Sequence, residues 1–320
     1  MRLERVAIIG AGAWGTALAQ AAAMAGRQVT LVGRDPTIIG EINEWHGNSV
    51  NLPGVTLLPA VTASDRVPEA DIVILAVPAQ ASREVLRRHA AALRGRIVVL
   101  TAKGLEHQSL KRQSEILAEI VPDATPFVLS GPSFAADVAA GRPTAVTLAG
   151  DDADLTSAVA AALAGPSFRL YAADDRIGVE IAGALKNVYA VACGAVEGAG
   201  LGASARSALL ARAFAELTRL VVGLGGSATT LTGLAGLGDL TLSCTSTQSR
   251  NYRYGISLGR GTRPGGELAE GVLTAPVAKE LADQLRIDAP LIDAVNLLLE
   301  GDTSINDIVA GLMSRPLKRE

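Results

Sequence analysis

The 320-residue sequence predicts an α/β domain followed by an all-helical domain, and three observations carry this prediction. Short apolar runs alternate with helical stretches as far as about residue 174. A glycine-rich turn separates the first of these runs from the first helical stretch. Beyond residue 174 the β-rich runs stop, and segments rich in alanine and leucine with helical periodicity follow.

The first half is expected to hold a mostly parallel sheet covered by helices on both faces. Runs rich in Val, Ile, Leu and Phe predict strands at residues 6–9, 28–32, 72–76, 97–100, 127–130, 144–148 and 168–171. Helical stretches such as 81–93 and 110–120 separate several of these runs. Strands that are apolar throughout and alternate with helices are typical of parallel sheets buried on both sides.

The second half is expected to be all-helical. Its periodicity predicts helices at residues 176–196, 207–223, 274–285, 289–299 and 304–312. Ser304 and Asp307 resemble a capping box, which would start the last of these helices. We divide the chain into residues 1–178 and 179–320. No Gly/Ser-rich hinge lies between the two parts, which favours close contact between them.

The composition predicts a globular chain with a large core and excludes several classes of function. Hydrophobic residues make up 49% and charged residues 19%, which is too apolar for a disordered protein. A net charge of −3 gives no support for nucleic-acid binding, although a local cluster of cations would still suit an anionic small molecule. We find no signal peptide and no charge-free apolar run long enough to span a membrane, and therefore expect a cytoplasmic protein.

No metal site is expected. His46, His89 and His107 lack the spacing of metal ligands. Cys193 and Cys244 lie in apolar, helix-like stretches with no histidine nearby in sequence. Both are therefore expected to be free, reduced thiols, with a catalytic thiol as the alternative interpretation.

The glycine-rich turn has the pattern of a dinucleotide-binding loop. Gly10, Gly12 and Gly15 form G-x-G-x-x-G between a strand and an apolar helix. The first glycine allows the tight turn, the second lets the backbone approach a pyrophosphate, and the third lets helix and strand pack closely. The N–H groups at the start of the helix then face the pyrophosphate. This context favours a Rossmann-type domain over a plain strand–helix turn.

The end of the second predicted strand bears on the choice of cofactor. An NAD-selective site usually places an acid there to hold the ribose 2′-hydroxyl. Arg34 lies at this position and would favour a 2′-phosphate, which suggests NADP(H). Asp35 is adjacent and keeps NAD(H) open, and a merely solvated charge is the alternative interpretation of Arg34.

Lys186 lies in the middle of an apolar helix, where an ammonium needs a partner or access to water. Few long aliphatic side chains surround its stem, and Asn187 offers a second polar group. We therefore favour a ligand site over a lysine that reaches the surface. Desolvation would lower its pKa and allow proton exchange near neutrality. Gly183, Ala190 and Gly194 lie with Asn187 on a small stripe that would let another backbone come close.

A second polar segment follows, in "GLAGLGDLTLSCTSTQSRNYRYG". Asp239 is expected in a turn rich in glycine and leucine. Ser249, Arg250 and Asn251 lead into a predicted helix. A hydroxyl, a guanidinium and an amide at a helix start suit a phosphate group. A helix cap with a surface arginine is the alternative interpretation.

Six segments together resemble the NAD(P)-dependent glycerol-3-phosphate dehydrogenases of the bacterial biosynthetic type, nearly from end to end. They are "GAGAWGTALA" (10–19), "LTAKGLE" (100–106), "LSGPSFA" (129–135), "EIAGALKNVYA" (180–190), "GLGDLTLSCTSTQSRN" (236–251) and "LAEGVLTA" (268–275). The last four, in this order and spacing, are far more specific than the glycine loop. The resemblance implies reduction of dihydroxyacetone phosphate to sn-glycerol 3-phosphate with NADPH or NADH, for glycerophospholipid synthesis. It also implies a homodimer.

The resemblance assigns roles to residues. It implies that Lys186 is the acid/base residue that exchanges a proton with the substrate oxygen. It implies substrate contacts for Lys103, Gly131, Ser133, Lys186, Asp239, Ser249, Arg250 and Asn251, the last three on the phosphate. It implies cofactor contacts for Gly10, Gly12, Ala13, Trp14, Gly15, Arg34, Lys103, Ala135, Arg250, Leu268 and Glu270. A packed aromatic and an exposed acid are the alternative interpretations of Trp14 and Glu270.

Two rival functions stay open at this point. A 3-hydroxy-acid dehydrogenase of related two-domain architecture would also use a helix lysine followed by asparagine, but would not need "CTSTQSRN". A non-catalytic dinucleotide-binding sensor would need the glycine loop but neither Lys186 nor the segment around Arg250. Turnover of glycerol 3-phosphate, with hydroxy acids ignored, would separate the two dehydrogenases.

Overall fold

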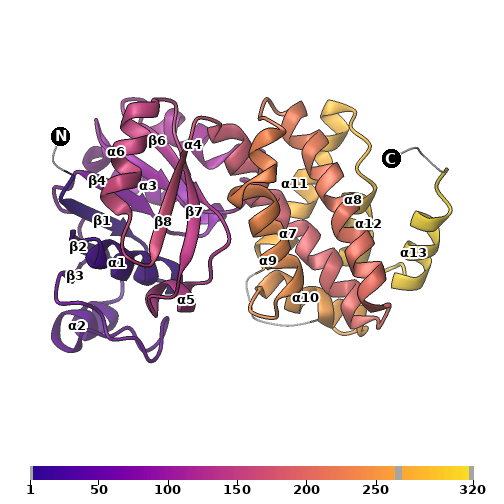
Figure 1. Ribbon diagram of the computed structural model, residues 1–320, viewed down its shortest axis with the longest axis horizontal. Coiled ribbons are helices and arrows are strands. Elements are labelled where there is room, and N and C mark those ends of the chain that lie inside the picture. Colours follow the sequence, from indigo (N-terminus) through magenta and orange to yellow (C-terminus); the bar gives the residue numbers. More distant parts are fainter. Residues whose placement is uncertain (1–2, 264–268, 317–320) are drawn as a thin grey trace.

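A sheet with helices on both faces forms one part of the molecule, and a group of helices lies beside it (Figure 1). The computed structural model describes residues 3–263 and 269–316. The strands are β1 (Arg5–Ile9), β2 (Gln28–Val32), β3 (Val61–Ser64), β4 (Ile72–Leu75), β5 (Ile97–Leu100), β6 (Thr125–Ser130), β7 (Thr144–Ala149) and β8 (Phe168–Ala173). All strands predicted from the sequence are present.

The strands form one mostly parallel sheet, as predicted. Their order is β3-β2-β1-β4-β5-β6-β7-β8. The strands from β1 to β6 run parallel, β7 is antiparallel to β6, and β8 is parallel to β7. The first six strands follow the Rossmann order, in which ligands bind beyond the carboxyl ends of the strands. The loops after β1, β5 and β6 therefore share one edge of the sheet.

Helices cover both faces because successive side chains of a strand point to opposite sides. Val6 and Ile8 of β1 belong to one apolar core with residues of α1, whereas Ala7 and Ile9 belong to another with residues of α3. The helices of this part are α1 (Ala13–Met24), α2 (Pro36–Trp45), α3 (Ser82–Leu93), α4 (Gln113–Ile120), α5 (Ala135–Ala139) and α6 (Ala153–Leu163), with a short 3₁₀ turn at Ala79–Ala81.

Strand β3 is an element that the sequence analysis missed. Its four residues, VTAS, include two hydroxyl side chains, so they lack the apolar run that marks the other strands. It pairs with β2 alone at the edge of the sheet. Short edge strands need little apolar surface because one side faces water.

The second half is helical, as predicted, and is built around α7 (Arg176–Gly198). The others are α8 (Gly202–Gly223), α9 (Asp239–Thr245), α10 (Arg250–Gly259), α11 (Glu270–Leu285), α12 (Pro290–Glu300) and α13 (Ile305–Met313), with short helical turns at Thr229–Thr232 and Leu234–Gly238. α7 is long and apolar enough to cross a membrane, yet its residues 178–196 are buried, and the helix packs against α8 to α12. It is the central helix of this core. Ser304 caps α13 by accepting the Asp307 N–H at 3.2 Å, at the predicted start.

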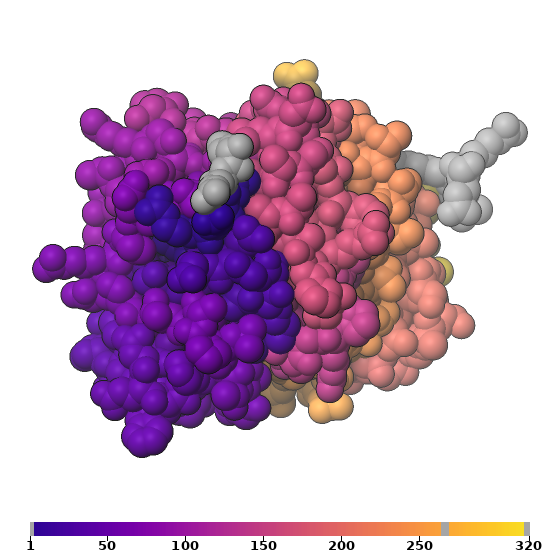
Figure 2. All heavy atoms as spheres, turned by 60° about the vertical axis from the view of Figure 1, so that its left-hand side comes forward, coloured from indigo at the N-terminus to yellow at the C-terminus, as the bar shows by residue number. Residues whose placement is uncertain are grey.

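The two halves are in close contact, as the missing hinge suggests. In the space-filling view, the pink atoms at the end of the first half border the orange atoms of the second half (Figure 2). Buried Glu180 of α7 accepts hydrogen bonds from the Ser114 N–H at 2.9 Å and the Ser114 hydroxyl at 2.6 Å, and Ser114 lies at the start of α4. Burial raises the pKa of Glu180 despite these hydrogen bonds.

The small stripe on α7 lets α10 approach it closely, as predicted. A Cβ on Gly194 would lie 2.1 Å from the Tyr252 carbonyl oxygen, and one on Gly255 would lie 2.1 Å from the Val191 carbonyl oxygen. No larger residue fits there without moving backbone. The start of α10 is thereby held beside the middle of α7.

The prediction that Asp239 lies in a turn is wrong. Asp239 is the first residue of α9, directly after a π-helical turn at Leu234–Gly238. The glycines before it reflect close packing, because a Cβ on Gly236 would lie 2.2 Å from the Leu231 carbonyl oxygen. Cys193 and Cys244 are buried and are not joined in a disulfide, as predicted.

The Glu216 carboxyl group lies buried between α8 and the start of α12. It accepts the Leu291 and Ile292 N–H groups, each at 3.0 Å, and the Tyr189 hydroxyl at 3.4 Å. Burial raises its pKa from 4.5 to about 7, and the backbone N–H groups oppose this shift. A carboxyl with a raised pKa in the folded state contributes stability below the unfolded pKa and loses it as pH rises.

The difference in stability between wild type and Glu216→Gln is therefore expected to depend on pH. Raising the pH from 4.5 to 7.5 should reduce the advantage of the wild type by about 3 kcal/mol, since the glutamine cannot ionise. Urea unfolding at several pH values measures this, with exposed Glu280→Gln as the control. Equal pH slopes for wild type and Glu216→Gln would contradict the prediction.

Candidate active site

The glycine loop has the geometry that a dinucleotide requires. Gly10 has φ of +117°, which favours glycine at this turn. A Cβ on Gly15 would lie 1.9 Å from the Gly10 carbonyl oxygen, whereas one on Gly12 would meet nothing within 4 Å. The open side of the loop is therefore at Gly12, where α1 begins with Ala13. Free N–H groups at this helix start suit a phosphate.

Other residues assigned to the cofactor lie around the same edge of the sheet. Arg34 is exposed after β2. Asp35 caps α2, because its Oδ1 accepts the Thr37 N–H at 2.9 Å. Trp14 and Ala135 are both partly buried against the core of the sheet. Trp14 thus packs against the core beside the loop, and its contact with the cofactor stays a prediction.

The centre of the candidate site is a buried carboxylate shared by two lysines. Asp239 at the start of α9 is 1% exposed. Its Oδ2 accepts a hydrogen bond from Lys103 Nζ at 2.7 Å, and its Oδ1 accepts one from Lys186 Nζ. Ser243, one turn further along α9, accepts another from Lys186 Nζ at 2.6 Å. Three segments distant in sequence thus meet at one group of charges.

The lysine of α7 does not reach the surface. Lys186 is 6% exposed. Burial lowers its pKa to about 8; the Asp239 carboxylate opposes this shift, and the charge of Lys103 assists it. An amine with this pKa donates a proton just below pH 8 and accepts one just above it. It can therefore serve as acid and as base near neutrality.

Lys103 is held at both its head and its backbone. Its Nζ donates to the Gly131 carbonyl oxygen at 3.0 Å as well as to Asp239. Its own carbonyl oxygen accepts the Asn187 side-chain amide at 2.8 Å. The Ser133 hydroxyl donates to the Gly131 carbonyl oxygen at 3.0 Å. Gly131 and Ser133 thus lie beside Lys103 at the carboxyl end of β6.

The 249–251 segment joins this group through Asn251. The Asn251 side chain donates to Asn187 Oδ1 at 2.9 Å and accepts the Gly271 N–H at 2.8 Å. Ser249 caps α10 by accepting the Tyr252 N–H at 3.3 Å, and Arg250 is exposed. Ser249 thus caps the helix and Arg250 lies at its open start, while the phosphate contacts of both residues stay predictions.

Glu270 begins α11 and lies near both the glycine-loop edge and Arg250. Its Oε1 accepts the Ala79 N–H at 3.4 Å. Burial raises its pKa, and the charge of Arg250 opposes the shift. Its Oε2 is buried with no hydrogen-bond partner. The exposed-acid interpretation is therefore wrong. Leu268 lies outside the described residues. In the described part of the chain, no three His, Cys, Asp or Glu residues group as a metal site would require.

The site also contains Ser243, which the sequence analysis did not select. The spacing could have identified it, because on a helix Ser243 lies on the same side as Asp239, four positions earlier. The expected turn at Asp239 concealed this relation. Asn187 was noted as a polar neighbour of Lys186, but it contacts Lys103 and Asn251 instead of standing free.

Comparison with known proteins identifies the family. The profile described as "NAD-dependent glycerol-3-phosphate dehydrogenase N-terminus" matches residues 5–156, and the corresponding C-terminus profile matches residues 175–310. A Caulobacter vibrioides protein named glycerol-3-phosphate dehydrogenase (NAD(P)+) is 48% identical over 330 positions, which cover 100% of both chains. The chain belongs to the NAD-dependent glycerol-3-phosphate dehydrogenase family. A Rhizobium johnstonii protein of the same name is 46% identical over 99% of both chains.

Solved structures agree with membership of the glycerol-3-phosphate dehydrogenase family. A glycerol-3-phosphate dehydrogenase from Coxiella burnetii is 35% identical, with a TM-score of 0.91 over 98% of this chain and 99% of that one. A D-mandelate dehydrogenase matches with a TM-score of 0.61 at 15% identity, a likeness in fold alone.

Proposed function

We propose that the protein catalyses the reduction of dihydroxyacetone phosphate to sn-glycerol 3-phosphate, and the reverse oxidation. In reduction, a hydride adds to the ketone carbon and the Lys186 ammonium gives a proton to the ketone oxygen. The products are the alcohol and the oxidised cofactor, with Lys186 left neutral. In oxidation, neutral Lys186 takes the hydroxyl proton. A nicotinamide cofactor held at the glycine loop would supply this hydride or receive it.

The observation that carries this proposal is the ion-paired group of buried Asp239, buried Lys186 and partly buried Lys103. Asp239 holds both ammonium groups in fixed positions, so Lys186 needs little rearrangement to reach the substrate oxygen. Lys103 adds a second positive charge where negative charge develops on that oxygen. A sensor that binds a dinucleotide without chemistry would not need a buried lysine with a lowered pKa.

We assign the start of α10 to the substrate phosphate. Arg250 is exposed there, one residue from the Ser249 hydroxyl. Helix N–H groups and a guanidinium together bind phosphate strongly. The Asn187–Asn251 hydrogen bond fixes the distance between this phosphate end and Lys186. That fixed distance favours a short phosphorylated substrate such as a triose phosphate.

We assign residues 1–178 to the cofactor and residues 179–320 to most of the substrate contacts. The open side of the glycine loop fits a dinucleotide pyrophosphate. NADPH is favoured over NADH because the Asp35 carboxylate caps α2, whereas the Arg34 guanidinium after β2 is exposed and would suit a 2′-phosphate. A cytoplasmic homodimer that serves glycerophospholipid synthesis completes the proposal. Light scattering of the purified protein measures the assembly.

The first experiment follows absorbance at 340 nm with dihydroxyacetone phosphate, separately with NADPH and NADH. Rapid loss that depends on the substrate is expected with at least one cofactor. The ratio of the two rates, repeated with Arg34→Ala, tests the role of Arg34. If folded protein shows no loss of absorbance with either cofactor but turns over hydroxy acids, the rival dehydrogenase is favoured.

Arg250→Ala is expected to raise the KM for dihydroxyacetone phosphate by roughly 10- to 100-fold with a smaller change in kcat. One charge-assisted hydrogen bond contributes about 1.5–3 kcal/mol, which gives this range. Steady-state kinetics measure it. Arg260→Ala, which removes an exposed arginine at the other end of α10, is the matched control. An unchanged KM would contradict the assignment of the substrate phosphate to the start of α10.

A further inference from the structure

The loop that carries Lys103 is held in place by side chains that lie outside the substrate group. The loop runs from the end of β5 to the start of α4. The Gln80 amide brackets its backbone, donating to the Leu105 carbonyl oxygen at 2.7 Å and accepting the His107 N–H at 3.0 Å. Gln113 donates to the Gly104 carbonyl oxygen at 2.9 Å. These bonds fix the residues that directly follow Lys103.

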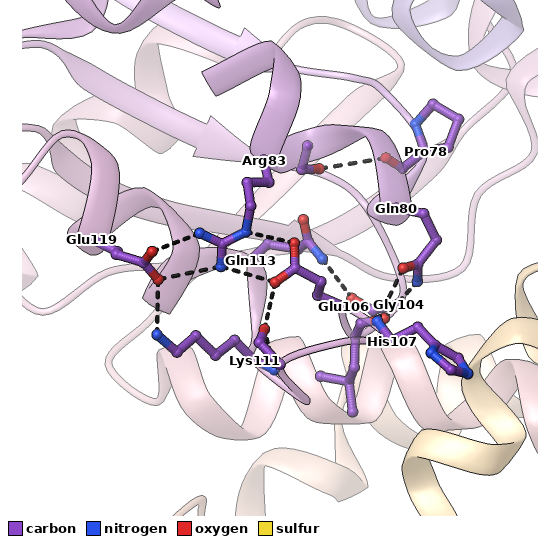
Figure 3. Close-up of polar contacts among 12 residues, drawn as sticks. Pro78, Gln80, Arg83, Gly104, Glu106, His107, Lys111, Gln113 and Glu119 are labelled. Atoms are coloured by element: carbon purple, nitrogen blue, oxygen red, sulfur yellow. Dashed lines mark hydrogen bonds and ion pairs between the residues drawn. The ribbon is translucent and has the colours of Figure 1, made fainter. Parts of the chain in front are cut away.

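Arg83, near the start of α3, makes a charged contact with the same loop. Its guanidinium lies between Glu106 of the loop and Glu119 of α4 (Figure 3). It donates to both oxygens of Glu106, each at 2.8 Å, and to Glu119 at 2.6 and 3.2 Å. Lys111 donates to Glu119 at 2.8 Å. Arg83 holds the pKa of Glu106 below its usual range and lowers that of Glu119 to about 2.

The contact is built for rigidity. The side chain of Glu106 is 10% exposed and that of Arg83 is 18% exposed, so water screens the pair weakly. A paired fork between guanidinium and carboxylate fixes orientation as well as distance. Leu110 in the same loop has φ of +59°, a conformation that costs a non-glycine residue energy and needs support from its surroundings. Ser109 adds a further hydrogen bond to Glu106.

We propose that Arg83 is a positioning residue for the reaction, which holds Lys103 on Asp239 by clamping Glu106 and thereby the loop. Glu106 is three residues from Lys103, and the Lys103 head must meet both Asp239 and the Gly131 carbonyl oxygen. A small shift of the loop would break these contacts. The inference rests on the roles proposed above for Lys103 and Lys186.

The contact between Arg83 and Glu106 should also affect the pKa of Lys186. The charged and titratable groups that face Lys186 are Asp239 and Cys244 of α9 and Lys103 of the loop, with Ser243 as a neutral partner. If Lys103 moves away, Lys186 loses a neighbouring positive charge and keeps the whole of Asp239. Its protonated form is then favoured. The alkaline limb of the reduction rate should therefore move to higher pH.

The test compares Arg83→Ala and Arg83→Lys with Arg88→Ala. Arg88 is on the same helix, pairs with Glu84 at 2.9 Å and is exposed, so it is a matched control. Arg83→Ala should lower kcat by about 10- to 100-fold, as expected for a small misplacement of a catalytic group, and shift the alkaline limb upward. Arg83→Lys keeps the charge without the fork and should give an intermediate loss. Arg88→Ala should match the wild type.

A double-mutant cycle with Lys103→Ala separates the possible outcomes. If Arg83 acts through Lys103, adding Arg83→Ala to Lys103→Ala should cause little further loss. Full additivity of the two losses would overturn the inference. So would a lower Tm in the Arg83 variants with unchanged kcat and pH limb, since that is a merely structural role. If Lys103→Ala alone is fully active, the role proposed for Lys103 fails instead.

Discussion

Lys186→Ala is expected to fold and bind cofactor while losing turnover by about 10²- to 10⁴-fold. This is the usual range for removing a positioned acid or base. The substitution removes the group that gives the substrate oxygen its proton, but it leaves Lys103 paired with Asp239 at 2.7 Å. The carboxylate therefore keeps a partner, and the fold should survive. Cofactor titration by fluorescence and the circular dichroism spectrum check binding and folding.

The pH profile gives this prediction a second measurement. With Lys186 as the acid and a pKa of about 8, the wild-type reduction rate should fall as pH rises above about 8, and the oxidation rate should rise through the same range. Lys186→Ala should lack both limbs. Lys279→Ala is the control, because Lys279 is half-exposed and pairs with Asp293 at the surface. Near-normal turnover in Lys186→Ala would refute the assignment of the acid.

The sequence predicted the parts of the fold that depend on local pattern. Apolar runs and helical periodicity located the strands of the sheet and the central helix α7. The stripe of small residues on α7 also predicted the close approach of another backbone, because a missing side chain has a direct steric meaning. Asp239 was misplaced because glycines that serve close packing look the same in sequence as glycines that form a turn.

The site was predicted only in part, because some of its contacts form between segments that are distant in the sequence. Lys186 was identified because an ammonium in an apolar helix needs a partner or access to water, and that need is visible in the local sequence. The sharing of Asp239 between Lys186 and Lys103 depends on three segments meeting in space, which no local pattern records. The clamp at Arg83 carries no sequence signal at all, since a charged residue near a helix start is usually solvated. Tertiary packing alone gives it a role.

Asp239→Asn, which replaces one side chain by another of nearly the same shape, is expected to lower both the free energy of unfolding and the turnover. It leaves the ammonium groups of Lys103 and Lys186 facing each other beside a neutral amide. Breaking a buried ion pair by neutralising one partner costs about 3–5 kcal/mol, so a lower free energy of unfolding should accompany a loss of turnover of about 10²-fold or more. Urea unfolding and steady-state kinetics measure both. Asp293→Asn, at the surface partner of Lys279, is the control.

The direction of the pH shift makes the Asp239→Asn result specific. The Asp239 carboxylate opposes the lowering of the Lys186 pKa, so its loss should lower that pKa further and move the alkaline limb to lower pH. Release of Lys103 by Arg83→Ala should move the same limb to higher pH. Opposite shifts from two substitutions would show that Lys186 responds to the charges around it. A limb that neither substitution moves belongs to another group, and Lys186 would then not be the acid.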